Sequence, residues 1–346
     1  MIYENILENL QLIVAGEQPK KDISGILINH KCDYLLDKLG INSTLNKVLN
    51  KISINERYRT CNNIFKQLEA NSISYAVIKG AALSLSVYGN PYIRNSGDID
   101  ILINRKDIDA IGQIMRENGF IQGHVINNSI VPFTRREIIF QTSSSHQTAP
   151  YIKSTENKLC PNIMVDINTD IMWGESEIKS DMELVFQETC HTVINGITFK
   201  KLCIEMEFIS LCLHHYKDMN SIYLLYERGL KLGHYCDIYF FVKNCNINLE
   251  TLYTYSRKLN VCEYIYYCLY YTNLIFQDAE IKPYIDLFYS EKSVALIDKF
   301  GLSDKERQTW NIDFFTRLFD INMRNYLETV LPKELLNKIK INQMLM

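Results

Sequence analysis

The chain has 346 residues, 47% of them hydrophobic and 22% charged, and 40 acidic against 37 basic residues give a net charge of −3. This excludes a disordered chain, a strongly basic nucleic-acid binder and an acidic tail protein, and the length allows two domains with a substantial core. The first residues lack the basic and apolar regions of a signal peptide, and no later apolar run reaches the ~18 residues of a membrane helix. We therefore expect a cytoplasmic protein without a membrane partner.

A helical N-terminal segment is expected over residues 1–56. Apolar residues recur there at helical spacing, as in Ile6, Leu10 and Ile13. The pattern is interrupted at the turn from Gly16 to Pro19 and again near Gly40. Nothing in this segment indicates chemistry.

Residues 57–185 alternate helical and strand patterns, which predicts a mixed sheet flanked by helices. A helix over 57–70 leads into a β-branched run at 73–78, and a helix over 81–88 precedes an apolar strand at 99–103. We then expect a helix over 107–118 and strands over 137–141 and 163–167, which are separated by a mobile loop that contains Ser143, Ser144 and Ser145. The fold class is therefore α+β with a single sheet.

Residues 186–346 are expected to form a helical C-terminal domain. Long runs with helical apolar spacing cover 205–216, 223–242 and 262–276, and most of their tyrosines are expected in the core. His215 lies in the apolar stripe of the first run, which favours a buried histidine over a ligand. The ten cysteines form no C-x-x-C pair, so most should be small buried side chains.

Two aspartates flank the first residue of the strand at 99–103. Because side chains alternate along a strand, Asp98 and Asp100 point to one face, and Ile99, Ile101 and Ile103 point to the other. Burying two like charges unpaired costs stability, whereas a divalent cation between them reverses that balance. Asp166 on the strand at 163–167 would complete a set of hard oxygen ligands suited to Mg²⁺.

The surroundings of the aspartates decide how this pattern is interpreted. A D-x-D pair alone most often marks a solvated strand end or a turn. Here Ser96 and Gly97 precede the pair, and a separate strand ends at Lys79-Gly80, where a helix begins whose N-terminal amides could hold phosphate. This context favours a metal and phosphate site over a solvated turn.

These residues resemble the nucleotidyltransferases of the DNA polymerase β type, and within them a poorly characterised bacterial subgroup. The superfamily has a Gly-containing turn, an Asp-x-Asp strand and a third acidic residue on a later strand, which correspond here to 77–80, 97–102 and 165–167. The resemblance is closest over 73–105 and extends to about 170. It implies a polymerase-β-like core, with a helical N-terminal extension and a helical C-terminal domain.

The chain departs from the family pattern at three places. Ala81 follows Gly80 where a serine or glycine is common, and Asn168 stands where the subgroup often has histidine. The segment between Gly80 and Asp98 is also longer than in many relatives, which makes 88–96 a candidate phosphate or acceptor loop.

The resemblance implies transfer of a nucleoside monophosphate from an NTP, for example ATP, with release of pyrophosphate. Asp98, Asp100 and Asp166 would be the catalytic and metal-binding residues for two Mg²⁺ ions, with Mn²⁺ as a possible substitute. Lys79, Gly80, Arg94 and Ser96 would bind the nucleotide, although Lys79 and Arg94 could instead pair with the aspartates structurally.

Three functions are left open by the sequence. The first is transfer to a small-molecule or peptide acceptor, favoured because the chain is not basic overall. The second is transfer to tRNA or to a protein, as in related toxin-like enzymes. The third is a nucleotide-binding or partner-binding module without turnover.

Overall fold

The computed structural model describes residues 2–40, 44–127, 129–144, 146–174, 176 and 178–345. The chain forms two compact units. We call one the helical unit; it comprises Met1–Asn42, Cys212–Lys243 and Asn260–Met346. The other, the sheet unit, comprises Ser43–Leu211 and Asn244–Leu259. The domain limits expected at 56 and 185 stay a prediction, because compactness alone does not define a domain that functions independently.

The main sheet belongs to the sheet unit and has the strand order β1-β2-β6-β5-β3-β4. β2 and β6 run parallel, whereas the other neighbouring strands are antiparallel, so the sheet is mixed as predicted. Its strands are β1 (Tyr75–Ile78), β2 (Ile99–Ile103), β3 (Ile121–Ile126), β4 (Ser129–Pro132), β5 (Tyr151–Ser154) and β6 (Asn162–Asn168).

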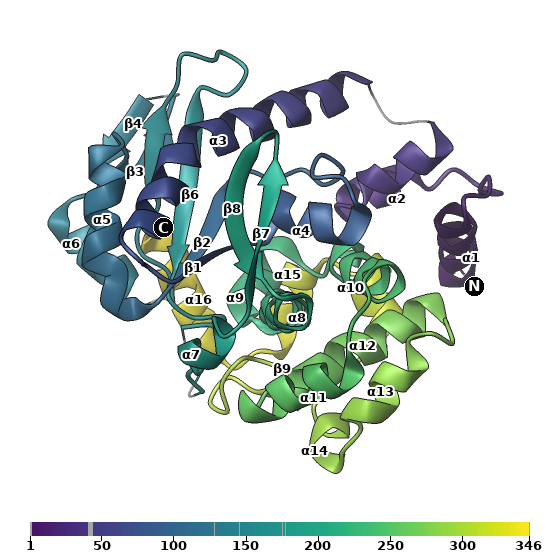
Figure 1. Cartoon of the computed structure of the whole chain (residues 1–346). Coiled ribbons are helices and arrows are strands. Elements are labelled where there is room, and N and C mark those ends of the chain that lie inside the picture. Colours follow the sequence, from purple (N-terminus) through teal and green to yellow (C-terminus); the bar gives the residue numbers. More distant parts are fainter. Residues whose placement is uncertain are drawn as a thin grey trace. The chain divides into compact units, whose positions relative to one another are not determined.

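Along the chain, helices of the sheet unit precede, separate and follow these strands (Figure 1). They are α3 (Thr44–Ala70), α4 (Gly80–Tyr88), η2 (Arg105–Asp107), α5 (Ile108–Glu117), α6 (Arg135–Ser144), α7 (Met182–Val185) and α11 (Leu249–Lys258). A separate hairpin is formed by β7 (Thr189–Ile194) and β8 (Ile197–Leu202), and α8 (Ile204–Asn220) has residues in both units.

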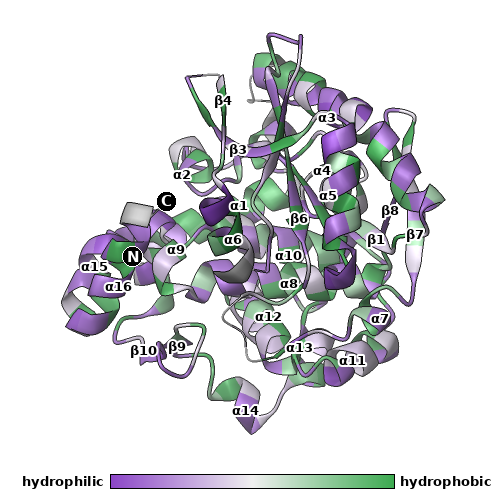
Figure 2. Ribbon diagram, turned by 90° about the vertical axis from the view of Figure 1, so that its left-hand side faces the viewer, coloured by the Kyte–Doolittle hydropathy of each residue, from purple (hydrophilic) through white to green (hydrophobic). Residues whose placement is uncertain are grey.

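The long helix α3 provides much of the core of the sheet unit. Its buried residues recur every three or four positions, as helical packing on one face requires, and the helix is banded in hydrophilic and hydrophobic colours in Figure 2. Phe65 on this stripe packs against Tyr75 of β1 and Phe199 of β8, with ring centroids 6.1 and 5.6 Å apart. This packing joins the helix, the main sheet and the hairpin in one apolar cluster.

The helical unit is built mainly from helices. These are α1 (Ile2–Ala15), α2 (Ser24–Asn29), η1 (Asp33–Leu39), α9 (Ile222–Arg228), α10 (Leu232–Asn244), α12 (Cys262–Phe276), α13 (Lys282–Phe288), α14 (Glu291–Val294), the π-helix η3 (Thr316–Asp320), α15 (Met323–Val330) and α16 (Lys333–Leu345). A short hairpin pairs β9 (Lys299–Phe300) with β10 (Gln308–Thr309). None of the described helices combines the length and the apolar character needed to cross a membrane.

The predicted strands at 73–78, 99–103 and 163–167 are confirmed as β1, β2 and β6, and the helices at 81–88 and 107–118 as α4 and α5. The strand expected at 137–141 is wrong, because α6 covers it. Thr134 begins this helix with a capping box, in which its backbone N–H and its hydroxyl donate to the Glu137 carboxylate at 2.6 and 2.7 Å. Of the expected loop, Ser143 and Ser144 end α6, and Ser145 lies outside the described residues.

Three further expectations need correction. The helix expected at 57–70 is the second half of α3, because no Gly or Pro interrupts the chain from 44 to 70. The run at 223–242 is two helices, because Gly229 ends α9 with φ of +62°. The chain has more than the single sheet expected, because residues 189–202, placed in the helical domain, form the β7–β8 hairpin around an Asn195-Gly196 turn in which both residues have positive φ.

We predict that Phe65→Ala will destabilise the sheet unit by about 3–5 kcal/mol, because it empties a buried ring site. The exposed Val48→Ala on the same helix should change stability by less than about 0.5 kcal/mol. Urea unfolding followed by circular dichroism measures both changes. Equal effects of the two substitutions would contradict the assignment of the core.

Candidate active site

The sheet brings the predicted aspartates together on adjacent strands. β2 and β6 are parallel and in a register that sets Asp100 beside Asp166, and Asp98 directly precedes β2. Asp100 is 7% exposed, and the other two are partly buried. The carboxylates therefore act on one another at the sheet centre, where water screens charge poorly.

Asp100 is held by two donors. Its Oδ1 accepts a hydrogen bond from Lys79 Nζ at 3.0 Å and another from Asn168 Nδ2 at 3.0 Å. Asn168 is in turn fixed by Gln147, whose Nε2 donates to the Asn168 Oδ1 at 2.8 Å. Asn168, a departure from the family pattern, thus holds the neighbouring aspartate in place.

Asp98 and Asp166 lack such neutralisation. Within the described residues neither carboxylate forms an ion pair with a cationic side chain. Burial, followed by the charges of Asp100 and Asp98, raises the pKa of Asp166 to about 7. Burial and the charge of Asp100 also raise the pKa of Asp98, while Lys79 and Arg57 act in the opposite direction. The site carries an excess of negative charge that a cation would relieve.

The Lys79-Gly80 turn joins β1 to α4 in a strained conformation. Lys79 has φ of +59° and ψ of −160°, which is rare for a residue with a side chain, and Gly80 has φ of +49°. A Cβ built on Gly80 would lie 2.7 Å from the Ser96 Oγ. Only glycine allows this close approach between the helix start and the loop before β2.

Ser96 and Arg94 lie in the loop that connects α4 to β2. The Ser96 hydroxyl donates to the carbonyl of Asp98 at 3.0 Å, which fixes the turn leading into the strand. The backbone of Arg94 is bound on both sides, because its N–H donates to Ser84 Oγ at 3.3 Å and its carbonyl accepts from Asn50 Nδ2 at 3.1 Å. The candidate loop at 88–96 is therefore anchored to α3 and α4.

Arg57 is a site residue that the sequence analysis missed. It is 8% exposed in the middle of α3, and its Nη1 donates to the Ser96 carbonyl. Burial lowers the pKa of its guanidinium, and the charge of Asp98 partly offsets this. Its position three residues after Ile54 and four before Cys61, both buried, was the available signal, because it puts a charge on the apolar face of the helix.

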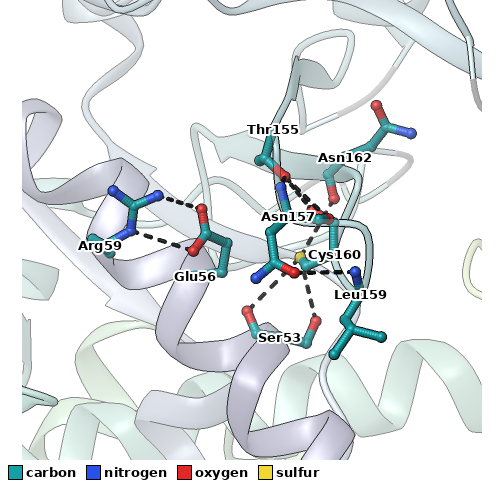
Figure 3. Close-up of polar contacts among 8 residues, drawn as sticks. All are labelled: Ser53, Glu56, Arg59, Thr155, Asn157, Leu159, Cys160 and Asn162. Carbon is teal, nitrogen blue, oxygen red and sulfur yellow. Dashed lines mark hydrogen bonds and ion pairs between the residues drawn. The ribbon is translucent and has the colours of Figure 1, made fainter.

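The loop between β5 and β6 is attached to the same helix (Figure 3). The Ser53 hydroxyl of α3 donates to Cys160 Sγ at 3.5 Å, and Thr155 Oγ1 closes the loop on the Cys160 carbonyl at 2.5 Å. Leu159 N–H donates to Asn157 Oδ1 at 3.0 Å. These contacts fix β6, which carries Asp166, against the helix that carries Arg57.

The aspartates suit a hard divalent cation by type and placement. Besides the two unpaired carboxylates, Asp100 Oδ2 has no hydrogen-bond partner within the described residues. In the present side-chain conformations, however, no three His, Cys, Asp or Glu side chains in the described ranges converge as a metal-binding group. Lys79 holds Asp100, so metal binding would require these side chains to reorient.

We predict that Gly80→Ala will destabilise the protein by about 1–3 kcal/mol, because it adds a Cβ at positive φ against Ser96. Gly97→Ala is the matched control in the same site, because its Cβ would meet nothing within 4 Å at an ordinary φ. Combining Gly80→Ala with Ser96→Ala should recover the steric part of the loss. Chemical unfolding of the four proteins measures these differences, and equal losses at Gly80 and Gly97 would contradict the close approach.

We predict that Asp166→Asn will stabilise the metal-free protein above pH 7 and have little effect near pH 4. The folded pKa of about 7 lies above the unfolded value near ~3.9. Stability linked to this proton is therefore fully present below pH ~4 and is lost as pH rises through the folded pKa of about 7.

Thermal unfolding in EDTA across this pH range measures the difference between the Asp166 variant and wild type. Asp109→Asn, an exposed aspartate on α5, is the control and should leave the pH profile unchanged. A profile for Asp166→Asn that stays parallel to wild type would show that the carboxylate titrates normally.

None of the curated proteins matches this chain. A solved nucleotidyltransferase-like protein, an antigenic protein from Paracoccidioides brasiliensis, is similar at 15% identity and a TM-score of 0.41, covering 68% of this chain and 94% of its own. Residues 48–277, which include the three aspartates and the Lys79-Gly80 turn, match a family described as Uncharacterised nucleotidyltransferase. The resemblance expected from the sequence is thereby confirmed, and the chain belongs to this nucleotidyltransferase family.

Proposed function

We propose that this protein is a Mg²⁺-dependent nucleotidyltransferase that moves a nucleoside monophosphate from an NTP to a small-molecule or peptide acceptor and releases pyrophosphate. The observation that carries the proposal is the set of interacting carboxylates on β2 and β6 beside a strained, glycine-containing helix start. Membership of the family supports the reaction class. We further propose that the main sheet is a polymerase-β-type core.

Asp98, Asp100 and Asp166 are proposed to hold Mg²⁺, for which Mn²⁺ could substitute. When bound, the metal would neutralise phosphate charge and lower the pKa of an acceptor hydroxyl. The raised pKa values of Asp98 and Asp166 support this role, because a bound cation favours the ionised carboxylates that burial disfavours. The protein supplies a rigid sheet that keeps the ligands in place.

Lys79, Gly80, Arg94 and Ser96 are proposed to bind the triphosphate. The N-terminal amides of α4 at Gly80 offer hydrogen bonds to phosphate oxygens, and a glycine at this point lets the phosphates approach the backbone. Lys79 already pairs with Asp100, so its ammonium could exchange that carboxylate for a phosphate when metal and nucleotide enter. Ser96 and Arg57 keep the loop before β2 in position.

The ion pair between Lys79 and Asp100 also supports a second candidate, a nucleotide-binding module without turnover. In such a module the ammonium would permanently take the place of a metal at Asp100. Binding of an NTP without release of pyrophosphate would favour the binding module, and release of pyrophosphate would exclude it. Transfer to tRNA or to a protein stays an alternative for the acceptor.

We expect one NTP to raise the unfolding temperature of the wild type only when Mg²⁺ is present, because a ligand that binds the folded state stabilises it. Asp98→Asn/Asp100→Asn should abolish this shift and lower product formation from α-labelled NTP by about 10²-fold or more. The control is Asp107→Asn/Asp109→Asn, a second D-x-D pair with the same change of charge outside the site.

A thermal-shift series with ATP, GTP, CTP and UTP, each with Mg²⁺ or EDTA, identifies the donor. Incubation of the labelled NTP with a small-molecule extract, with total tRNA or with protein then separates the acceptor classes. The proposal is wrong if no NTP shifts the wild type, or if the two double variants behave alike.

A further inference from the structure

A pocket of about 410 Å³ is lined by residues of the helical unit alone. It is bounded by the end of α9 and the loop to α10, by the π-helix η3, by the start of α15 and by His30. Its volume falls in the range of about 300–1,000 Å³ that small-molecule sites occupy. Four of its lining residues carry a positive charge and one a negative charge: Arg228, Lys231, Arg317 and Arg324 against Glu227.

Lys231 has no carboxylate to balance its charge within the part of the chain that is described. Burial lowers the pKa of its ammonium, and the positive charge of Lys31 lowers it further. An anion beside Lys231 would offset both the burial of its charge and the repulsion by Lys31. The position of Lys231 is thus one that an anionic ligand would stabilise.

Arg317 is a buried cation without a carboxylate partner among the described side chains. It is 4% exposed, and its Nη2 donates to the hydroxyl of Tyr271 at 2.9 Å. Its guanidinium lies 4.6 Å from the ring centroid of Trp310. Its Nε has no hydrogen-bond partner within the described residues. Buried charges are normally paired, so this arginine indicates an anion that completes its surroundings.

His30 adds a neutral donor to the same pocket. Its Nδ1 accepts a hydrogen bond from the Leu232 backbone N–H at 3.1 Å, so the proton of the neutral ring resides on Nε2. Burial and the charge of Lys231 lower its pKa to about 4, which keeps the ring neutral at physiological pH. A neutral N–H donor can bind a phosphate oxygen without adding to the repulsion between cations.

The remaining charges are only weakly compensated. Arg228 Nε lies 3.4 Å from Glu227, and Arg324 Nε lies 3.8 Å from Glu328, in pairs that are all about half exposed. Exposed pairs of this kind are worth little and are easily exchanged for a ligand. The pocket therefore keeps an excess of positive charge, located mainly at Lys231 and Arg317.

The backbone around the pocket is irregular as well. η3 is a π-helix, a form that occurs often at functional sites, and Gly229 ends α9 with φ of +62°. The π-helix and the end of α9 thus bring charged residues from separate parts of the chain to the same pocket.

We propose that this pocket binds the phosphate group of a small phosphorylated molecule. A phosphate dianion offsets the surplus positive charge better than a single carboxylate does, and the planar forks of the arginines match phosphate oxygens. This inference does not rest on the proposed transferase function, because none of the pocket residues belongs to the candidate active site.

Isothermal titration calorimetry with pyrophosphate tests the proposal, in EDTA and at an ionic strength of about 0.15 M. We expect one saturable site in the wild type, and about tenfold or more weaker binding in Lys231→Gln. Lys231→Arg should retain binding. Lys305→Gln removes an exposed lysine of the same unit and should bind as the wild type does.

Further variants distinguish binding of pyrophosphate in this pocket from binding at the candidate active site. Lys79→Gln, which removes a cation from the candidate active site, should bind pyrophosphate normally, and a loss there would assign the binding to the candidate active site instead. Without ligand, Lys231→Gln should unfold at the wild-type temperature or above it, because Lys231 forms no ion pair among the described residues and its repulsion by Lys31 is removed.

The absence of a saturable site, equal effects of Lys231→Gln and Lys305→Gln, or equally tight binding of succinate would overturn the proposal. Displacement of pyrophosphate from Asp98→Asn/Asp100→Asn by a short single-stranded RNA would assign the pocket to nucleic-acid phosphate and overturn the small-molecule assignment.

Discussion

The repulsion between carboxylates held on two neighbouring strands is the constraint on which the sheet unit depends. Parallel pairing of β2 with β6 fixes Asp100 beside Asp166, so neither strand can shift without breaking a buried ladder. Lys79 pairs with Asp100 and Asn168 donates a hydrogen bond to it, whereas neither makes such a contact with the other two carboxylates. The two other carboxylates keep raised pKa values, which is a cost in stability that a purely structural sheet would avoid by using apolar residues.

Several distant segments are arranged around this constraint. Arg57 in the middle of α3 binds the loop before β2, and Gly80 approaches the same loop from the start of α4. Cys160 attaches the β5–β6 loop to α3 through Ser53. Strained backbone, buried charge and close packing thus occur together at one end of β2. Such unfavourable features persist where the surrounding structure enforces them, and they are typical of functional sites.

The sequence predicted the centre of the candidate site better than its surroundings. The positions of Asp98, Asp100 and the Lys79-Gly80 turn follow from local patterns, because strand alternation and a glycine at a helix start are properties of a few adjacent residues. Arg57 and Gln147 were missed because their roles depend on residues far away in the chain. Their contacts form only after the strands have paired.

The errors in secondary structure have a different origin. At the helix α6 and at the β7–β8 hairpin, local turn and cap residues indicate the correct structure. The apolar residues beside them favour a different one. Glu137 stands three residues after Thr134, which is the spacing of a capping box and predicts the start of a helix. Asn195-Gly196 between two apolar runs is a strong signal for a hairpin. Turn and cap residues therefore carried more information here than the hydrophobic runs beside them.

The two units carry buried charges of opposite sign, which the net charge of the chain does not reveal. Within the helical unit, His215 Nε2 lies 3.1 Å from Asp237, and both side chains are nearly inaccessible, so this buried carboxylate has a hydrogen-bond partner within the unit. Surplus negative charge gathers at the aspartates of the sheet unit and surplus positive charge at Lys231 and Arg317 of the helical unit. In the net charge of −3 for the whole chain, these positive and negative regions largely cancel. Overall charge therefore says little about which anions or cations the protein binds, because binding depends on the few charges that the fold leaves without an opposite charge beside them.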